Sequence, residues 1–129
     1  MISMLSAKPR QRTLAPIVFA TLAVSTGAAL AGGFTLSSSD IKPGGPIKHE
    51  QVFNGFGCSG GNVSPALAWK NAPAGTRSFA LLVHDPDAPT GGGGFWHWLV
   101  ANLPAGTSEL PAGAGKGDGS ALPAGAVQV

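Results

Sequence analysis

SFALLVHDPDAPTGGGGFWHWLVANL, residues 78–103, holds two apolar runs, SFALLVHD (78–85) and FWHWLVANL (95–103), separated by a segment of prolines and glycines (86–94). Runs rich in valine, leucine and aromatic residues favour β-strands, and turn-forming residues between two such runs favour an antiparallel hairpin. The stretch therefore predicts a hairpin with a long loop as the centre of a mainly β fold.

Several ionisable side chains lie where this hairpin meets its loop, although only 11% of the residues in the chain are charged. If the loop is centred near Gly91, the two strands pair so that Asp85 lies opposite His97. The same register places Asp87 opposite Phe95. Because a strand's side chains alternate between its two faces, His84 is expected to point away from this acid and histidine. The face of the second strand that contains the histidine is formed by Phe95, His97, Leu99 and Ala101.

An acid beside an imidazole has several possible roles. A carboxylate can hold the ring in its cationic form, so that the remaining N–H donors of His97 bind an anion at the mouth of an apolar pocket. Asp85 and His97 could instead be a buried pair that only hydrogen-bonds to each other at a strand end. Trp96 and Trp98 would then be ordinary core residues. A hydrolase using Asp85 and His97 as acid and base is less favoured, because Ser64 lacks a GxSxG motif and the sequence offers no convincing nucleophile. No enzymatic activity is therefore expected.

A zinc site is not expected, because His84 and Asp85 are adjacent in a strand and point to opposite faces. The rest of the chain after Gly32 shows no sustained helical spacing and is interrupted often by glycine and proline. Further strands are predicted at 34–37, 48–53 and 66–69, with a turn at 71–75. The segment after Leu103 is predicted to be loop. One mainly β domain, residues 32–129, is expected.

The N-terminal segment predicts export. Lys8, Arg10 and Arg12 precede the uncharged run LAPIVFATLAVSTGAALA (14–31), which ends in the small-residue pattern Ala-Leu-Ala. This order is typical of a signal peptide, residues 1–31, cleaved after Ala31. A retained membrane anchor is the alternative, since the uncharged run from Thr13 to Ser39 is long enough to span a bilayer. Cleavage is favoured, which predicts a periplasmic or secreted protein without a stable membrane span.

Removal of residues 1–31 leaves five basic and six acidic side chains, a net charge of −1. The basic residues form no stripe that could neutralise a row of phosphates, so nucleic acid is not expected as a partner. Cys58 is the only cysteine of the chain. It is expected to be a small buried apolar residue, or to pair with a cysteine outside this sequence.

Several segments together resemble the phosphatidylethanolamine-binding protein family, in its bacterial YbhB/YbcL-like or Raf kinase inhibitor-like branch. They are GCSGGNVSPALAW (57–69), SFALLVHDPDAPTG (78–91), FWHWLVANLP (95–104) and the LPAGA repeats that begin at 110 and 122. The resemblance implies a Greek-key β-sheet fold with a pocket for phosphate and phosphoryl head groups. Its ligand-binding residues would be Asp85 and Asp87 of DPDAP and His97 of WHW, with Pro86 at the rim and no cofactor or metal.

Family members continue into a segment resembling GYGGPCPPxGxxHRY, which supplies backbone donors, a second histidine and an aromatic wall to the pocket. The resemblance implies that this chain ends before that segment, so that the fold is incomplete at its C-terminus. It also implies that the cysteine of that segment would pair with Cys58. The expected function is an exported binding protein for small anionic or phosphorylated ligands. An inhibitor or protein-interaction module is the alternative that the family name suggests.

Overall fold

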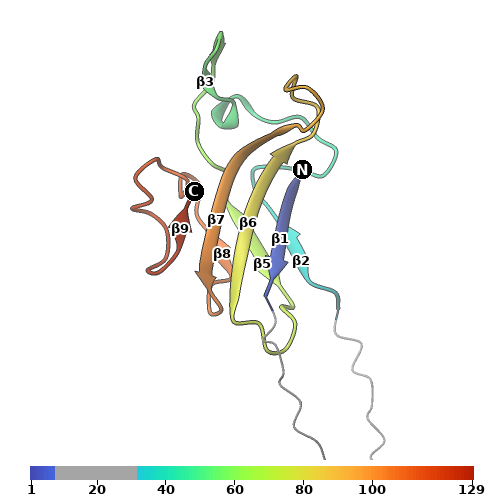
Figure 1. The fold of residues 1–129 in the computed structure, drawn as a ribbon, viewed down its shortest axis with the longest axis vertical. Coiled ribbons are helices and arrows are strands. Elements are labelled where there is room, and N and C mark those ends of the chain that lie inside the picture. Colours follow the sequence, from blue (N-terminus) through green and yellow to red (C-terminus); the bar gives the residue numbers. More distant parts are fainter. Residues whose placement is uncertain (8–31) are drawn as a thin grey trace, which may run out of the picture.

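The computed structural model describes residues 1–7 and 32–129, and these residues form a mainly β fold (Figure 1). Helical structure in them is limited to one short 3-10 turn, η1 (His49–Gln51). The strands are β1 (Ile2–Ser6), β2 (Thr35–Ser37), β3 (Asn54–Gly55), β4 (Cys58–Ser59), β5 (Leu67–Lys70), β6 (Ser78–Asp85), β7 (Phe95–Pro104), β8 (Glu109–Leu110) and β9 (Val127–Gln128). The predicted mainly β fold class is confirmed.

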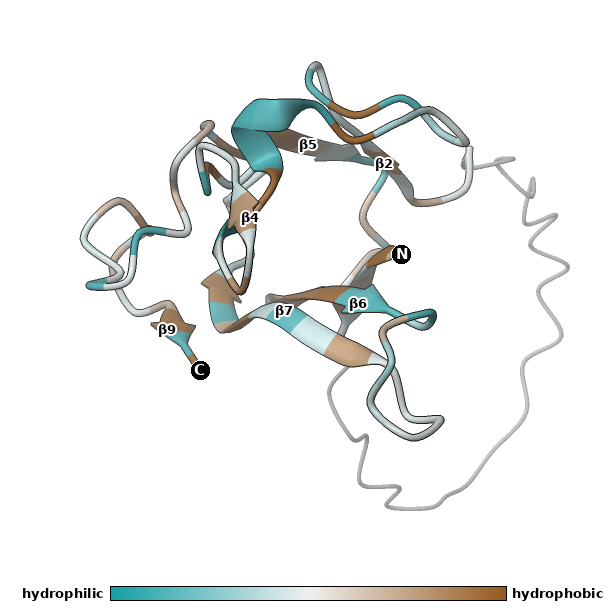
Figure 2. Cartoon of the chain, turned by 90° about the horizontal axis from the view of Figure 1, so that it is seen from above, coloured by the Kyte–Doolittle hydropathy of each residue, from teal (hydrophilic) through white to brown (hydrophobic). Residues whose placement is uncertain are grey.

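The strands form two main sheets that face each other. One sheet has the order β1-β6-β7-β9 and the other the order β2-β5-β8, while β3 and β4 make a separate small hairpin. All neighbouring strands are antiparallel. Seen from above, β2 and β5 lie in one layer and β6 and β7 in the other (Figure 2). The fold is therefore a two-layer β structure, in which each sheet covers the apolar face of the other.

The core lies between these layers and draws residues from both. Its buried members are Leu67, Trp69, Phe79, Leu81, Trp98, Val100, Leu103, Leu110 and Ala114. Aromatic rings join the sheets: Phe79 of β6 stacks on Phe34 at a centroid distance of 6.0 Å and meets Trp69 of β5 edge-on at 5.5 Å. Such ring pairs add roughly 0.5–1.5 kcal/mol beyond area burial. The central hairpin is thus fixed from its apolar face.

The predicted hairpin is present as β6 and β7, but its predicted register is wrong. Asp85 pairs with Phe95 rather than with His97, and His84 pairs with Trp96. The pairing then shifts twice along the strands, between Val83 and His84 and between Phe79 and Leu81. Each shift adds a residue to β7, which no single loop centre can reproduce.

These shifts also change the buried face of β7. Trp98, Val100 and Leu103 are buried, whereas Phe95 and Ala101 of the predicted stripe are exposed. Trp98 is a core residue as expected, but Trp96 is 48% exposed. The indole Nε1 of Trp98 donates to Gln128 Oε1 at 2.8 Å, which ties β9 to the edge of β7.

The strand predicted at 48–53 is absent, and η1 takes its place. Val52 N donates to His49 O at 3.2 Å, as in a 3-10 turn, and Val63 N donates to Glu50 O at 2.8 Å. A Cβ at Gly60 would lie 2.0 Å from Val52 O, so this close approach of two backbones requires glycine. The backbone carbonyls of Glu50, Val52 and Phe53 accept from Val63, Asn62 and Gly60, so they are not available to a main sheet.

The other predicted elements are close to those observed. Strands β2 and β5 cover most of 34–37 and 66–69, and the turn at 71–75 is closed by Thr76 N donating to Pro73 O at 3.1 Å. The segment after Leu103 is mostly turns, but it also contributes β8 and β9, which were not predicted. Leu110 of β8 is buried and gives this segment an anchor in the core.

The first residues of the expected signal peptide lie in the sheet, where β1 pairs with β6 along its whole length. Residues 8–31, with the uncharged run and the cleavage motif, lie outside the described residues. Within the described ranges, no helix has the length and apolar character needed to cross a membrane. Cys58 is exposed on β4, so the expectation of a buried cysteine is wrong.

Candidate functional site

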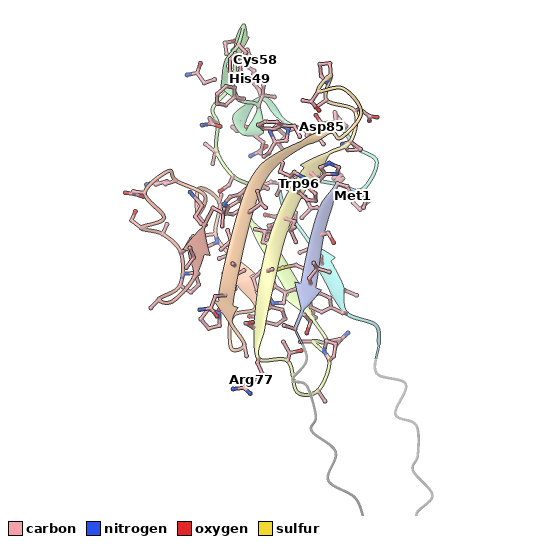
Figure 3. All side chains as sticks on the ribbon, viewed as in Figure 1. Met1, His49, Cys58, Arg77, Asp85 and Trp96 are labelled. Atoms are coloured by element: carbon pink, nitrogen blue, oxygen red, sulfur yellow. The ribbon has the colours of Figure 1, made fainter. Side chains whose placement is uncertain are left out.

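Asp85 and His97 come together at the loop end of the central hairpin. The carboxylate Oδ2 of Asp85 lies 3.7 Å from Nε2 of His97, and the two side chains are 44% and 49% exposed. Asp85 is the last residue of β6 and lies opposite Phe95, so His97 is its diagonal neighbour on the same face. The predicted proximity of the two side chains is confirmed, through a different register. Figure 3 shows Asp85 at this end of the fold.

The loop holds the Asp85 carboxylate in place. Its Oδ1 accepts the backbone N–H of Asp87 at 3.0 Å, which forms a turn around Pro86. One carboxylate oxygen therefore serves the loop, and the other faces His97. Pro86 and Asp87 are both exposed. The Asp87 side chain thus adds a second negative charge to the solvent side of the site.

The far end of the loop returns closely to Asp85. Gly94 has a φ of +65°, and a Cβ there would lie 2.4 Å from Asp85 O. Thr90 Oγ1 donates to Gly94 O at 2.6 Å and closes the loop. Glycine at this position is therefore required both by the left-handed backbone and by the close approach.

His84 takes no part in the Asp85–His97 pair. Its ring stacks on Trp96 at a centroid distance of 4.1 Å, and its Nε2 lies 3.1 Å from Gly93 O. His84 and Trp96 hold the loop from the other side of the hairpin. This agrees with the prediction that His84 is structural and faces away.

Phe95 belongs to the site, although sequence reasoning did not include it. Its ring meets the His97 ring edge-on at a centroid distance of 4.9 Å, and it is 51% exposed. The same alternation that placed Phe95 and His97 on one face was the signal that could have identified it. The candidate site is thus an imidazole with an aromatic neighbour and two carboxylates, open to solvent.

The candidate site is open to solvent, because Asp85, His97 and Phe95 are each about half exposed. Two hollows, of about 430 Å³ and about 390 Å³, lie elsewhere, one beside Leu67 and Leu110 and one beside Trp69 and Lys70. Neither of these two hollows is lined by the candidate residues. In residues 1–7 and 32–129, no three histidine, cysteine or acidic side chains are close enough together to hold a metal ion.

Chemically, such a site can bind both signs of charge. A protonated His97 donates to a phosphate or carboxylate oxygen, while Asp85 and Asp87 accept from an ammonium group. Both carboxylates repel inorganic phosphate, and His97 attracts it only when its ring is protonated. A ligand that carries a cation beside its phosphate therefore matches the arrangement of charges better than a bare anion does.

Comparison with known proteins identifies the chain's relatives. Residues 37–129 match the sequence profile of the family described as "Phosphatidylethanolamine-binding protein". The UPF0098 protein YbcL of Escherichia coli (strain K12) is 53% identical over 112 residues, which are 87% of this chain and 61% of that protein. The putative lipoprotein LppC of Mycobacterium tuberculosis (strain ATCC 25618 / H37Rv) is 35% identical over 103 residues, 80% of this chain and 47% of that protein.

The structural likeness agrees. The crystal structure of E. coli YbcL, described as a new member of the mammalian PEBP family, has a TM-score of 0.71 and 54% identity, and the match covers 73% of this chain and 57% of that one. The chain spans about half to three-fifths of the length of these relatives. The sequence profile, the close relatives and the shared β architecture show that this chain belongs to the phosphatidylethanolamine-binding protein family.

Proposed function

We propose that the protein binds small phosphorylated or anionic ligands at Asp85, Asp87 and His97, with Pro86 at the rim. The observation that carries the proposal is the distance of 3.7 Å between Asp85 Oδ2 and His97 Nε2 in two half-exposed side chains. An accessible imidazole beside a carboxylate is a donor that a ligand can reach. Family membership supports the same class of function.

The ligand that fits best carries a phosphate and an ammonium group, as phosphoethanolamine does. His97 donates to a phosphate oxygen, and the ammonium group approaches Asp85 or Asp87. A charge-assisted hydrogen bond contributes roughly 1.5–3 kcal/mol, so each contact raises affinity by about tenfold or more. The ring of Phe95 meets the His97 ring edge-on and forms an apolar neighbour for the bound ligand.

The proposed role is binding without turnover. Ser64, the serine considered as a nucleophile, accepts the backbone N–H of Gly115 at 2.8 Å through its Oγ. The hydroxyl of Thr90, in the loop itself, donates to Gly94 O. Both hydroxyls are hydrogen-bonded within the fold, and in the described residues neither bonds a histidine that could activate it.

We also propose that the protein is exported to the periplasm or secreted. The basic segment and uncharged run of residues 1–31 support this. The relative LppC is named a putative lipoprotein, which is consistent with an envelope location.

Nuclear magnetic resonance titration of the full chain tests the ligand site. Phosphoethanolamine, inorganic phosphate and ethanolamine are added separately, and the shifts of the His97 ring and the Asp87 amide are followed. We expect phosphoethanolamine to bind more tightly than either fragment and H97Q to weaken binding about tenfold or more. H49Q is the matched control, because His49 lies in the exposed η1 and is expected to leave binding unchanged. Binding that is insensitive to H97Q would contradict the proposal.

A further inference from the structure

The N-terminal strand β1 closes one edge of the central hairpin. Ile2 pairs with Val83 and Ser6 with Phe79, in antiparallel register without a shift. The N-terminal amino group of Met1 donates to His84 O, and His84 N donates to Met1 O at 2.9 Å. The N-terminal end of β1 therefore lies beside His84, the residue before Asp85 of the candidate site. Figure 3 shows Met1 and Asp85 at the same end of the fold.

The side chains of β1 alternate between the core and solvent. Ile2 and Met4 pack against the buried core, opposite Val83 and Leu81, whereas Leu5 is 60% exposed. At the far end, the Ser6 hydroxyl bonds the Thr76 hydroxyl at 2.7 Å. The edge of β6 thus selects apolar residues at alternate positions and a small hydroxyl residue at the end.

The register defines which backbone groups of β6 form hydrogen bonds with β1. Met1 and His84 exchange both hydrogen bonds, so the hydrogen-bonded pairs continue at every second residue. The amides of Ala80 and Leu82 therefore point to β1, and those of Phe79 and Leu81 point to β7. Two sets of amides in one strand report separately on its two neighbours.

We propose that the edge of β6 is a docking site for an extended strand. Its occupant is the chain's own segment Ile2–Ser6, and the same segment added as a free peptide can replace it. The segment is short, and among the described strands it pairs with β6 alone. It also belongs to the leader that is expected to be removed. Without it, the amides of Ala80 and Leu82 and the apolar surface of Val83 and Leu81 would face water. An open edge of this kind favours pairing with an extended segment.

Amide hydrogen exchange of the full chain tests the first half of the proposal. M4D places a charge against the core, and L5D places the same charge on the exposed face as a matched control. We expect M4D to raise exchange at Ala80 and Leu82 by about tenfold or more, with little change at Phe79 and Leu81, and L5D to change none of them. If M4D unfolds the whole chain, M4A is used instead, and we expect a smaller loss of exchange protection at the amides of Ala80 and Leu82.

Addition of a peptide of residues 1–7, MISMLSA, to the M4D chain tests the second half. We expect protection to return at Ala80 and Leu82. A peptide in which both Ile2 and Met4 are replaced by serine is expected to have no effect. The proposal is overturned if MISMLSA leaves exchange unchanged, or if M4D does not alter it. It is also overturned if the M4D chain dimerises and keeps these amides protected, because the preferred occupant would then be a second copy.

Discussion

Asp85 pairs with Phe95 across the hairpin, yet its carboxylate Oδ2 lies 3.7 Å from Nε2 of His97. His97 is two residues after Phe95 in β7, on the same face. The Oδ1 of Asp85 accepts the N–H of Asp87. A single carboxylate therefore links the turn of the loop to the imidazole of the neighbouring strand. The two oxygens can be separated by mutation, because asparagine keeps an acceptor for the turn and loses the charge.

A double-mutant cycle of D85N and H97Q is expected to give a coupling energy of about 0.2–1 kcal/mol. Both side chains are close to half exposed, so solvent screens the pair and limits what it adds to stability. Urea unfolding of the single and double variants measures the coupling. A value well above about 2 kcal/mol would indicate a desolvated pair and would contradict a site that is open to ligands.

The loop depends on Gly94 more than on Gly92. Both residues have positive φ, +65° and +107°, so alanine at either position costs about 1–2 kcal/mol in backbone strain. At Gly94 the new Cβ also meets Asp85 O at 2.4 Å, while at Gly92 nothing lies within 4 Å. We expect G94A to lose at least about 1 kcal/mol more than G92A in urea unfolding, with amide shifts at Asp85 and Asp87. Equal losses would mean that the loop does not need this close approach.

The two faces of β6 predict different costs for neighbouring leucines. Leu81 is fully buried at 0% exposure, whereas Leu82 faces the other side and is partly exposed. L81A is expected to cost about 2–5 kcal/mol, and L82A less than half of that. Thermal or urea unfolding of the full chain gives both values. Similar costs would show that the core does not lie on the side described.

The hairpin could be predicted because its signals are local. Two apolar runs with a Pro/Gly segment between them fixed the bounds of β6 and β7 closely, and the alternation of side chains brought Asp85 and His97 to one face. Family motifs in the same stretch led to the correct family. Residue type and spacing sufficed for the hairpin and the shared face, whereas the family came from resemblance to known motifs.

Other features depend on contacts that the sequence does not display. With the two register shifts between β6 and β7, Trp98 is buried in the core and Leu99 is only partly buried. Segment 48–53 has the composition of a strand, but Gly60 and Gly61 bring a second backbone against it, and a 3-10 turn results. Cys58 is exposed because β4 belongs to a small hairpin outside the main sheets.

Export predicts the loss of residues 1–31. In a bacterial host, intact-mass measurement of periplasmic or secreted material is expected to show a chain that begins at Gly32, because the basic start, uncharged run and Ala-Leu-Ala motif occur in the required order. A29R, which places a charge in the cleavage motif, is the control and should remain uncleaved. Secreted material that still begins at Met1 would contradict the prediction and leave β1 in place.

The chain is expected to bind inorganic phosphate weakly, with a Kd of about 1 mM or higher. That Kd corresponds to about 4 kcal/mol of binding energy, whereas one charge-assisted hydrogen bond from His97 supplies roughly 1.5–3 kcal/mol. Asp85 and Asp87 oppose the anion, and Asp87 is exposed beside the site. Tighter binding needs further converging donors.

Calorimetric titration with phosphate compares this chain with full-length E. coli YbcL, of which the match covers 61%. It tests whether the part of YbcL outside the match supplies further hydrogen-bond donors. We expect the relative to bind phosphate more tightly, and D87N in this chain to improve binding slightly by removing one repulsive charge. Tight, His97-independent binding of phosphate by this chain would place the anion site elsewhere, and the hollow beside Lys70 would then be the next site to test.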